Sequence, residues 1–97
     1  MMTDREMLEL AAKAAGIEHL SSEYCVNGPE LWDIERKRWW RPLTNDGDAF
    51  RLMVALRLWR DDPDICCIER VEDHDGDAYA ATRRAIVRAA AQIGAQM

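Results

Sequence analysis

The chain has 97 residues, of which 48% are hydrophobic and 32% are charged, and its formal net charge at pH 7 is −5. This length is below the roughly 150 residues of a typical domain, so we expect one domain spanning residues 1–97 and no large buried cofactor. The composition excludes a disordered or collagen-like chain, and no apolar run approaches the roughly 18 residues that a membrane-spanning helix needs.

A first helix is predicted over residues 4–15. Thr3 and Glu6 form the T-x-x-E pattern of a capping box, in which each side chain satisfies a backbone N–H of the other residue. Apolar residues then recur with the period of a helix, namely Met7, Leu8, Leu10, Ala11, Ala14 and Ala15. Gly16 is expected to end the helix, because glycine adopts the left-handed conformation at little cost.

A β-hairpin is predicted over residues 22–36. Its first strand contains residues 24–26, its turn is Asn27-Gly28, and its second strand runs through residues 31–34. The segment that follows, Arg36-Lys37-Arg38-Trp39-Trp40-Arg41, is expected either to continue the second strand or to form a short third one.

Two more helices are predicted, over residues 47–59 and 77–95. Asn45 or Asp46 is expected to cap the first of them. The inner face of the last helix is expected to consist of Tyr79, Ile86, Ala89, Ala90 and Ile93. Between these helices the apolar run at 65–68 is the best candidate for a buried strand, because it lacks polar alternation.

The element order is therefore α-β-β-(β)-α-β-α, which is typical of an α+β domain. We expect an α/β/α sandwich, in which a small, mostly antiparallel sheet is covered by three helices on its two faces. The alternative is a sheet with all helices on one face.

Three segments of the chain resemble the phage ABA-sandwich domain family. Residues 40–52 are similar to its W-x-P-L-x-x-D-G-D-A-x-R-L signature, residues 3–17 to its beginning and residues 77–91 to its closing helix. The resemblance covers nearly the whole chain except residues 18–39. It implies a small protein of tailed phages and prophages with an α-β-α layered fold, and it implies no particular reaction.

The segment at 36–41 is the strongest candidate for a binding surface. Its residues Arg36, Arg38, Trp39, Trp40 and Arg41 combine guanidiniums with indoles. Such a set can form a protein-binding hot spot, or it can hold a nucleotide by charge, stacking and cation–π contact. The third interpretation is a half-buried strand in which Trp40 packs in the core and the cations alternate outward.

The last predicted helix carries a second candidate, Arg84 and Arg88. These residues are four apart and share a face, whereas Arg83 points about 100° away. Such a pair can grip a phosphate, or it can form salt bridges with acids such as those in the 69–77 segment. The salt-bridge interpretation is the more common one for exposed basic faces.

The sequence predicts no metal site, no cofactor and no catalytic residues. The acidic loop at 72–77 fails the calcium-loop pattern, because position 6 is Ala78 and position 12 is Arg84. The three cysteines form no C-x-x-C pair, and no nucleophile or phosphate-loop motif is present. The loop is therefore interpreted as a solvated helix cap.

Charge is distributed in blocks along the chain. Residues 36–60 carry seven bases and two acids, whereas residues 61–77 carry eight acids and one base. The acidic total disfavours binding to duplex nucleic acid but leaves a local basic patch open, and the blocks can also be partners within the fold. The N-terminal MMTDREML is too acidic for a signal peptide, so we expect reduced cysteines and a location in the host cytoplasm, away from membranes.

These observations lead to a non-enzymatic phage accessory protein that binds a host or phage protein, with a host-defence component as one such partner. The alternative is a nucleotide or small-ligand sponge that uses the Arg/Trp-rich segment. A homodimer is a further option, because apolar runs and exposed indoles suit a self-complementary interface.

Overall fold

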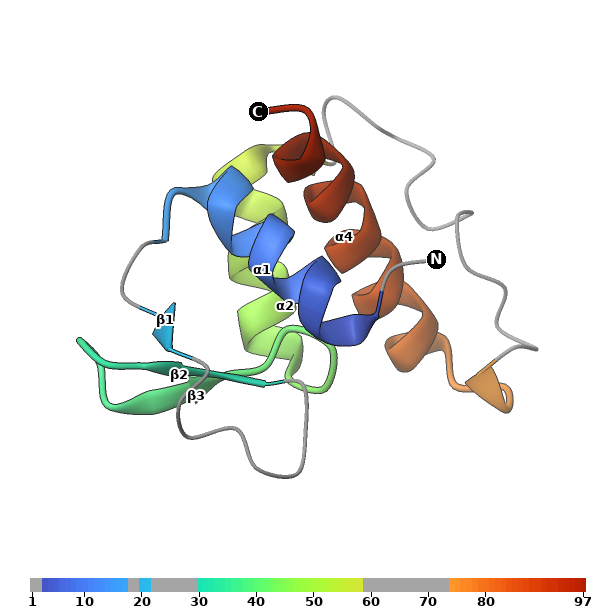
Figure 1. Ribbon diagram of the computed structural model, residues 1–97. Coiled ribbons are helices and arrows are strands. Elements are labelled where there is room, and N and C mark those ends of the chain that lie inside the picture. The colour runs from blue at the N-terminus through green and yellow to red at the C-terminus, as the bar shows by residue number, and fades with distance from the viewer. Residues whose placement is uncertain (1–2, 18–19, 22–29, 59–73) are drawn as a thin grey trace.

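The structure is a computed structural model, and it describes residues 3–17, 20–21, 30–58 and 74–97 (Figure 1). The helices are α1 (Asp4–Ala15), α2 (Asp46–Leu56) and α4 (Ala78–Ala95), and the strands are β1 (Leu20–Ser21), β2 (Leu31–Asp33) and β3 (Arg38–Trp40). Their order confirms an α+β protein with three helices and a small antiparallel sheet. The strands predicted at 24–26 and 65–68, and the turn at Asn27-Gly28, lie outside the described residues.

The bounds of α1 are those predicted. The Thr3 hydroxyl oxygen accepts a hydrogen bond from the Glu6 backbone N–H at 3.1 Å, and Gly16 takes the left-handed conformation with φ 73°. The capping box differs from the prediction in its second bond. The Glu6 carboxylate accepts from the Thr3 hydroxyl at 3.2 Å, and not from the Thr3 backbone.

The second helix, α2, begins at Asp46, one residue before the predicted start, and it ends early. Asn45 is its cap, and the Asn45 side chain accepts from the Asp48 backbone N–H at 2.9 Å. The helix ends at Leu56, and not at residue 59, because Arg57 adopts the left-handed conformation with φ 53°. The Arg57 N–H then donates to the last carbonyls of the helix, at Met53 and Val54.

The three strands form an antiparallel sheet in the order β1-β2-β3. The predicted second strand is shorter than expected, since β2 ends at Asp33 and Ile34 is 55% exposed in the turn that follows. The Asp33 carbonyl accepts from the Lys37 N–H at 2.8 Å, which closes this turn. The segment at 36–41 thus contains a separate third strand, β3, which was one of the two predicted options.

The helices lie together on one side of the sheet (Figure 1). α1 packs on α4, and α2 contacts both. The described residues therefore show helices on one side of the sheet only, and they do not show the predicted sandwich with helices on both faces. No helix in this part of the chain is both long and apolar enough to cross a membrane.

The last helix, α4, fills the core with small residues. Val87, Ala85 and Ala90 are fully buried, and Gly94 lies against the backbone of Leu10 in α1. The predicted inner face is confirmed at Ile86, Ala89 and Ala90 and is wrong at Tyr79 and Ile93, which are 70% and 39% exposed. Tyr79 is on the side that faces α2, but it lines an open groove there.

Candidate functional site

The predicted Arg/Trp segment is divided between a turn and a strand. Residues 34–37 form the turn between β2 and β3, and β3 contains Arg38, Trp39 and Trp40. Successive side chains of a strand point to opposite faces. Trp40 packs in the core with the helices, so Arg38 shares the helix-facing side and Trp39 lies on the other side. The two indoles therefore do not form one surface.

Asp48, in the first turn of α2, lies at the centre of this region and is only 2% exposed. Its Oδ1 accepts from Nη2 of Arg38 at 2.8 Å and from Nη1 of Arg51 at 3.0 Å. Its Oδ2 accepts from the backbone N–H of Arg41 at 2.9 Å. One buried carboxylate thus links β3, the connection after β3 and α2, and the two guanidiniums compensate its charge.

The tryptophans have structural contacts of their own. Trp40 is 8% exposed, which agrees with the half-buried-strand interpretation and removes this ring from any surface that a partner could reach. Trp39 is opposite Trp32 in the sheet register. Their rings pack edge to face, with centroids 5.2 Å apart and an interplanar angle of 76°. This geometry is a favourable one for aromatic pairs.

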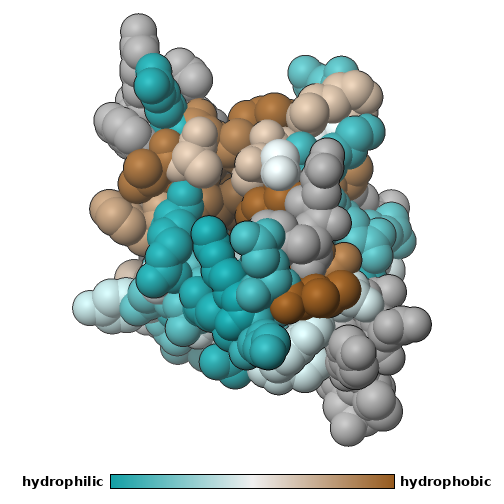
Figure 2. Space-filling view, turned by 90° about the vertical axis from the view of Figure 1, so that its left-hand side faces the viewer, coloured by the Kyte–Doolittle hydropathy of each residue, from teal (hydrophilic) through white to brown (hydrophobic). Residues whose placement is uncertain are grey.

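Arg36 and Arg41 are exposed residues that contribute to the fold through their backbones. The Arg36 N–H donates to Oδ1 of Asp33 at 2.9 Å, and the Arg41 N–H donates to Asp48. Within the described part of the chain no ion pair involves either guanidinium. Figure 2 looks onto the side of the molecule where β2 and β3 turn, and hydrophilic residues gather there in a broad patch below apolar ones.

The arginines of α4 connect the helices to one another. Nη2 of Arg84 lies 3.0 Å from Oδ1 of Asp4, so Arg84 forms a salt bridge that joins α4 to α1. Most of the acidic segment at 69–77, the expected partner, lies outside the described residues. Arg88 is half-buried on the same helix. Arg83 is outside the predicted pair, and its Nη1 binds Oδ1 of Asp46 at 2.6 Å. Its Nε donates to the Leu43 carbonyl at 2.9 Å.

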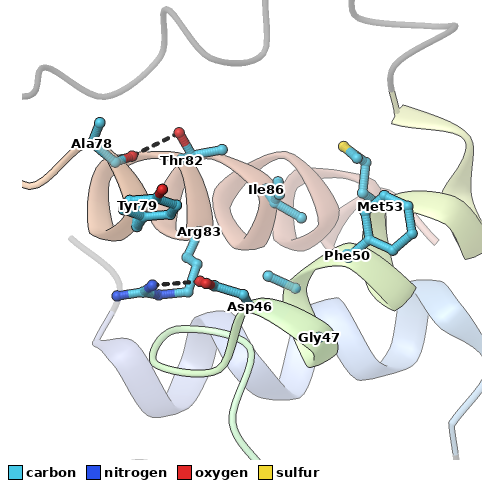
Figure 3. A pocket seen from close by; sticks show the side chains of 10 residues that line it. Asp46, Gly47, Phe50, Met53, Ala78, Tyr79, Thr82, Arg83 and Ile86 are labelled. Carbon is cyan, nitrogen blue, oxygen red and sulfur yellow. Dashed lines mark hydrogen bonds and ion pairs between the residues drawn. The ribbon is translucent and has the colours of Figure 1, made fainter.

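A groove lined mainly by apolar residues lies between α2 and α4, and we call it the α2–α4 groove (Figure 3). Its volume is about 690 Å³. Its residues are Asp46, Gly47, Ala49, Phe50, Met53, Ala78, Tyr79, Thr82, Arg83 and Ile86. Phe50 and Tyr79 are 60% and 70% exposed and lie towards opposite ends of the groove, and the Asp46–Arg83 ion pair lies on the Tyr79 side (Figure 3).

The sequence did not predict this groove. Helical periodicity predicts Tyr79 on the inner face of α4, but it cannot show that the space opposite Tyr79 is open. The one sequence signal for an apolar surface here is Phe50, a large apolar residue of α2 that lies outside the buried face formed by Ala49 and Leu52.

Other predicted features have structural roles or cannot be placed. The Asp77 side chain caps α4 by accepting from the Ala80 N–H at 3.0 Å, as the helix-cap interpretation of the acidic loop expects. Among residues 3–17, 20–21, 30–58 and 74–97, no three His, Cys, Asp or Glu side chains form a group that could hold a metal ion. The three cysteines lie outside those residues.

Comparisons with models of protein families, with curated proteins and with solved structures found no match to this chain. The resemblance to the phage ABA-sandwich domain family therefore stays a prediction.

Proposed function

We propose that this chain acts by binding another protein without catalysing a reaction, and that the partner inserts an apolar segment into the α2–α4 groove. The observation that carries this proposal is the exposure of two aromatic side chains at one groove, Phe50 at 60% and Tyr79 at 70%. Aromatic side chains bury a large apolar area on binding, and interface energy concentrates on such residues. Covering both rings would stabilise a complex.

The shape of the groove suits a segment of a partner protein. Its floor contains the buried residues Ala49 and Ile86, and its ends carry the two exposed rings. An amphipathic helix docks into such a hollow by placing residues at i, i+3, i+4 and i+7 on an apolar floor. We therefore expect the partner to contribute a helix with an apolar ridge.

The charges along α2 indicate the chemistry of that helix. No acid occurs between Ala49 and Leu58, and the cations Arg51 and Arg57 are both exposed. Asp46, at the other end of α2, is already paired with Arg83. An acidic residue on the partner, next to the ridge and opposite Arg57, would complement this surface.

The biological setting of the proposal depends on the family resemblance. A phage or prophage accessory protein in the host cytoplasm would bind a host or phage protein, and a component of host defence is one such partner. A three-layered α-β-α architecture belongs to the same proposal, because the resemblance implies it.

A comparison of matched variants tests the proposal. Tagged wild-type protein and its Phe50→Asp and Tyr79→Asp variants are exposed to host lysate at physiological salt, and a retained protein is then purified and titrated against each. Ile34→Asp is the control, because Ile34 is 55% exposed in the β2–β3 turn, away from the groove residues. We expect both groove variants to lose the partner and the control to keep it. Equal retention by all four proteins would contradict the proposal, and so would a wild-type dimer that only the groove variants abolish, since a second copy would then fill the groove.

The nucleotide-sponge alternative has less support. Trp39 and Trp40 lie on opposite sides of β3, and Arg38 is bound to Asp48, so rings and guanidiniums do not form one stacking site. It predicts a rise in melting temperature with nucleotides, and a flat response across a nucleotide panel would exclude it.

A further inference from the structure

A second hollow lies between the turn end of the sheet, the C-terminal end of α1 and helix α2. We call it the Asp33–Asp48 pocket, and its volume is about 230 Å³. Its polar wall contains Asp33, Arg36, Asp48 and Arg51, and its apolar wall contains Ala15, Ile17, Trp40, Leu52 and Ala55. Charged groups and a hydrocarbon surface thus meet in one small cavity.

The two carboxylates of this pocket are part of the protein's own hydrogen-bond network. Asp33 and Asp48 are 3% and 2% exposed. Asp48 accepts three hydrogen bonds, two of them from guanidiniums, and Oδ1 of Asp33 accepts from the Arg36 N–H. Because these oxygens already have donors, the pocket is a poor site for a cation.

Arg51 and Arg36 each have guanidinium N–H donors that make no hydrogen bond within the described residues. Arg51 uses Nη1 for Asp48, and its side chain is 62% exposed. Arg36 is exposed, and its bond to Asp33 comes from the backbone, so within the described residues its guanidinium has no hydrogen-bond partner. A guanidinium presents five N–H donors in a planar fork that matches a carboxylate.

We propose that the Asp33–Asp48 pocket binds a compact, monoanionic organic carboxylate. The carboxylate group lies at Arg36 and Arg51, and the apolar part of the molecule lies against Trp40 and Leu52. This ligand site is separate from the α2–α4 groove, and the proposal does not depend on the proposed function.

The charge of the pocket selects a single negative charge. Among the described residues, the carboxylates of Asp33 and Asp48 balance the guanidiniums of Arg36 and Arg51. Arg38, which binds Asp48 from outside the lining, leaves these residues with an excess of one positive charge. A monoanion neutralises that excess. A phosphate dianion would meet two buried carboxylates, whose repulsion in a poorly solvated site is costly.

Benzoate is a suitable probe, with benzamide as its neutral counterpart and inorganic phosphate, at a pH above its second pKa, as the dianion. The experiment titrates each compound into the full chain and follows backbone and side-chain N–H signals by NMR. We expect benzoate to shift the signals of Arg36, Arg51 and the Trp40 indole in a saturable way. Benzamide and phosphate should bind at least about tenfold more weakly, because charge-assisted bidentate bonds are lost or opposed.

Three variants locate the site. Arg36→Gln should weaken benzoate binding by about tenfold while keeping the backbone bond to Asp33, whereas Arg41→Gln, outside the pocket lining, should leave it unchanged. Ala55→Met should abolish binding by filling the cavity, and it should fold normally because Ala55 is exposed on α2. The proposal would be overturned if benzoate gave no saturable shift, or if the shifts were confined to other residues. It would also be overturned if benzamide or phosphate bound as well as benzoate, or if the two arginine variants had equal effects.

Discussion

Asp48 of α2 and Arg38 of β3 form an ion pair of 2.8 Å, in which the carboxylate side chain is 2% exposed and the arginine side chain 40% exposed. The pair lies within the basic block at 36–60, which contains two acids, Asp46 and Asp48. Asp46 is likewise bound, by Arg83 of α4. Both acids of this block therefore connect elements of the fold.

Removing the carboxylate of Asp48 should destabilise the protein. Asp48→Ala leaves the Arg41 N–H and two guanidiniums without their acceptor, so we expect the free energy of unfolding to fall by about 3 kcal/mol. Urea denaturation measures this change. A loss below about 1 kcal/mol would show that the buried carboxylate contributes little net stability.

Arg41→Ala is the matched control for this prediction. Arg41 is exposed and reaches Asp48 through its backbone N–H, which alanine retains. We expect the free energy of unfolding to stay within about 0.5 kcal/mol of the wild type. A larger loss would mean that the Arg41 side chain has a structural contact of its own.

The edge-to-face pair of Trp32 and Trp39 should give an exciton couplet in far-ultraviolet circular dichroism, because the two rings are 5.2 Å apart at a large angle. Trp39→Phe should abolish the couplet. Trp40→Phe should leave it, since Trp40 lies on the other side of β3. If the couplet survives in Trp39→Phe, the register that places Trp39 opposite Trp32 is wrong.

Local signals in the sequence predict the ends of elements where a side chain itself determines the backbone. The Thr3 cap, the left-handed Gly16 and the Asn45 cap are of this kind. The end of α2 is different, because Arg57 adopts a left-handed conformation that no arginine favours. Nothing in its residue type predicts that conformation.

The candidate sites depend on contacts between distant segments, and periodicity alone could not predict them. Asp48 and Leu52 are four residues apart on one face of α2, and both are buried, so an acid on an apolar face was the available signal for the carboxylate network. The α2–α4 groove had no such signal. Its existence depends on what packs opposite Tyr79, and the sequence of α4 does not contain that information.

Lys37 occupies the last position of the β2–β3 turn with φ 55°, in the left-handed region. A residue with a Cβ pays roughly 1–2 kcal/mol for that conformation, and glycine does not. Glycine loses more entropy on folding, by roughly 0.5–1 kcal/mol, so we expect Lys37→Gly to raise the free energy of unfolding by about 0.5 kcal/mol. Thermal and urea denaturation both report the change.

Lys37→Val tests the same position in the opposite direction. A β-branched side chain is strained at positive φ, so this variant should lose about 1 kcal/mol relative to the wild type. If the glycine and valine variants had equal stability, the turn would not impose the left-handed conformation in solution.

At Gly94 the backbone of α4 lies directly against the backbone of α1. Of the glycines that the structure describes, Gly94 leaves the least space for a Cβ. A Cβ on Gly94 would overlap the carbonyl oxygen of Leu10 and lie 2.7 Å from its carbonyl carbon. Alanine favours a helix interior by about 0.8–1.0 kcal/mol over glycine, so propensity alone predicts that Gly94→Ala stabilises the protein. We expect the opposite, a net loss of about 2 kcal/mol, because the backbone of Leu10 cannot rotate away as a side chain could and the helices must separate.

Gly47→Ala makes the same substitution on α2, where the new Cβ meets side-chain atoms and not backbone. The added Cβ would lie 3.2 Å from Oδ1 of Asn45 and 3.4 Å from Nη1 of Arg51, and both are side-chain atoms. We expect a change within about 0.5 kcal/mol of the wild type, since the gain in helix propensity offsets a small adjustment of those side chains. Urea denaturation of the two variants side by side separates packing from propensity. If Gly94→Ala were as stable as Gly47→Ala, α1 and α4 could not be packed backbone to backbone at this point.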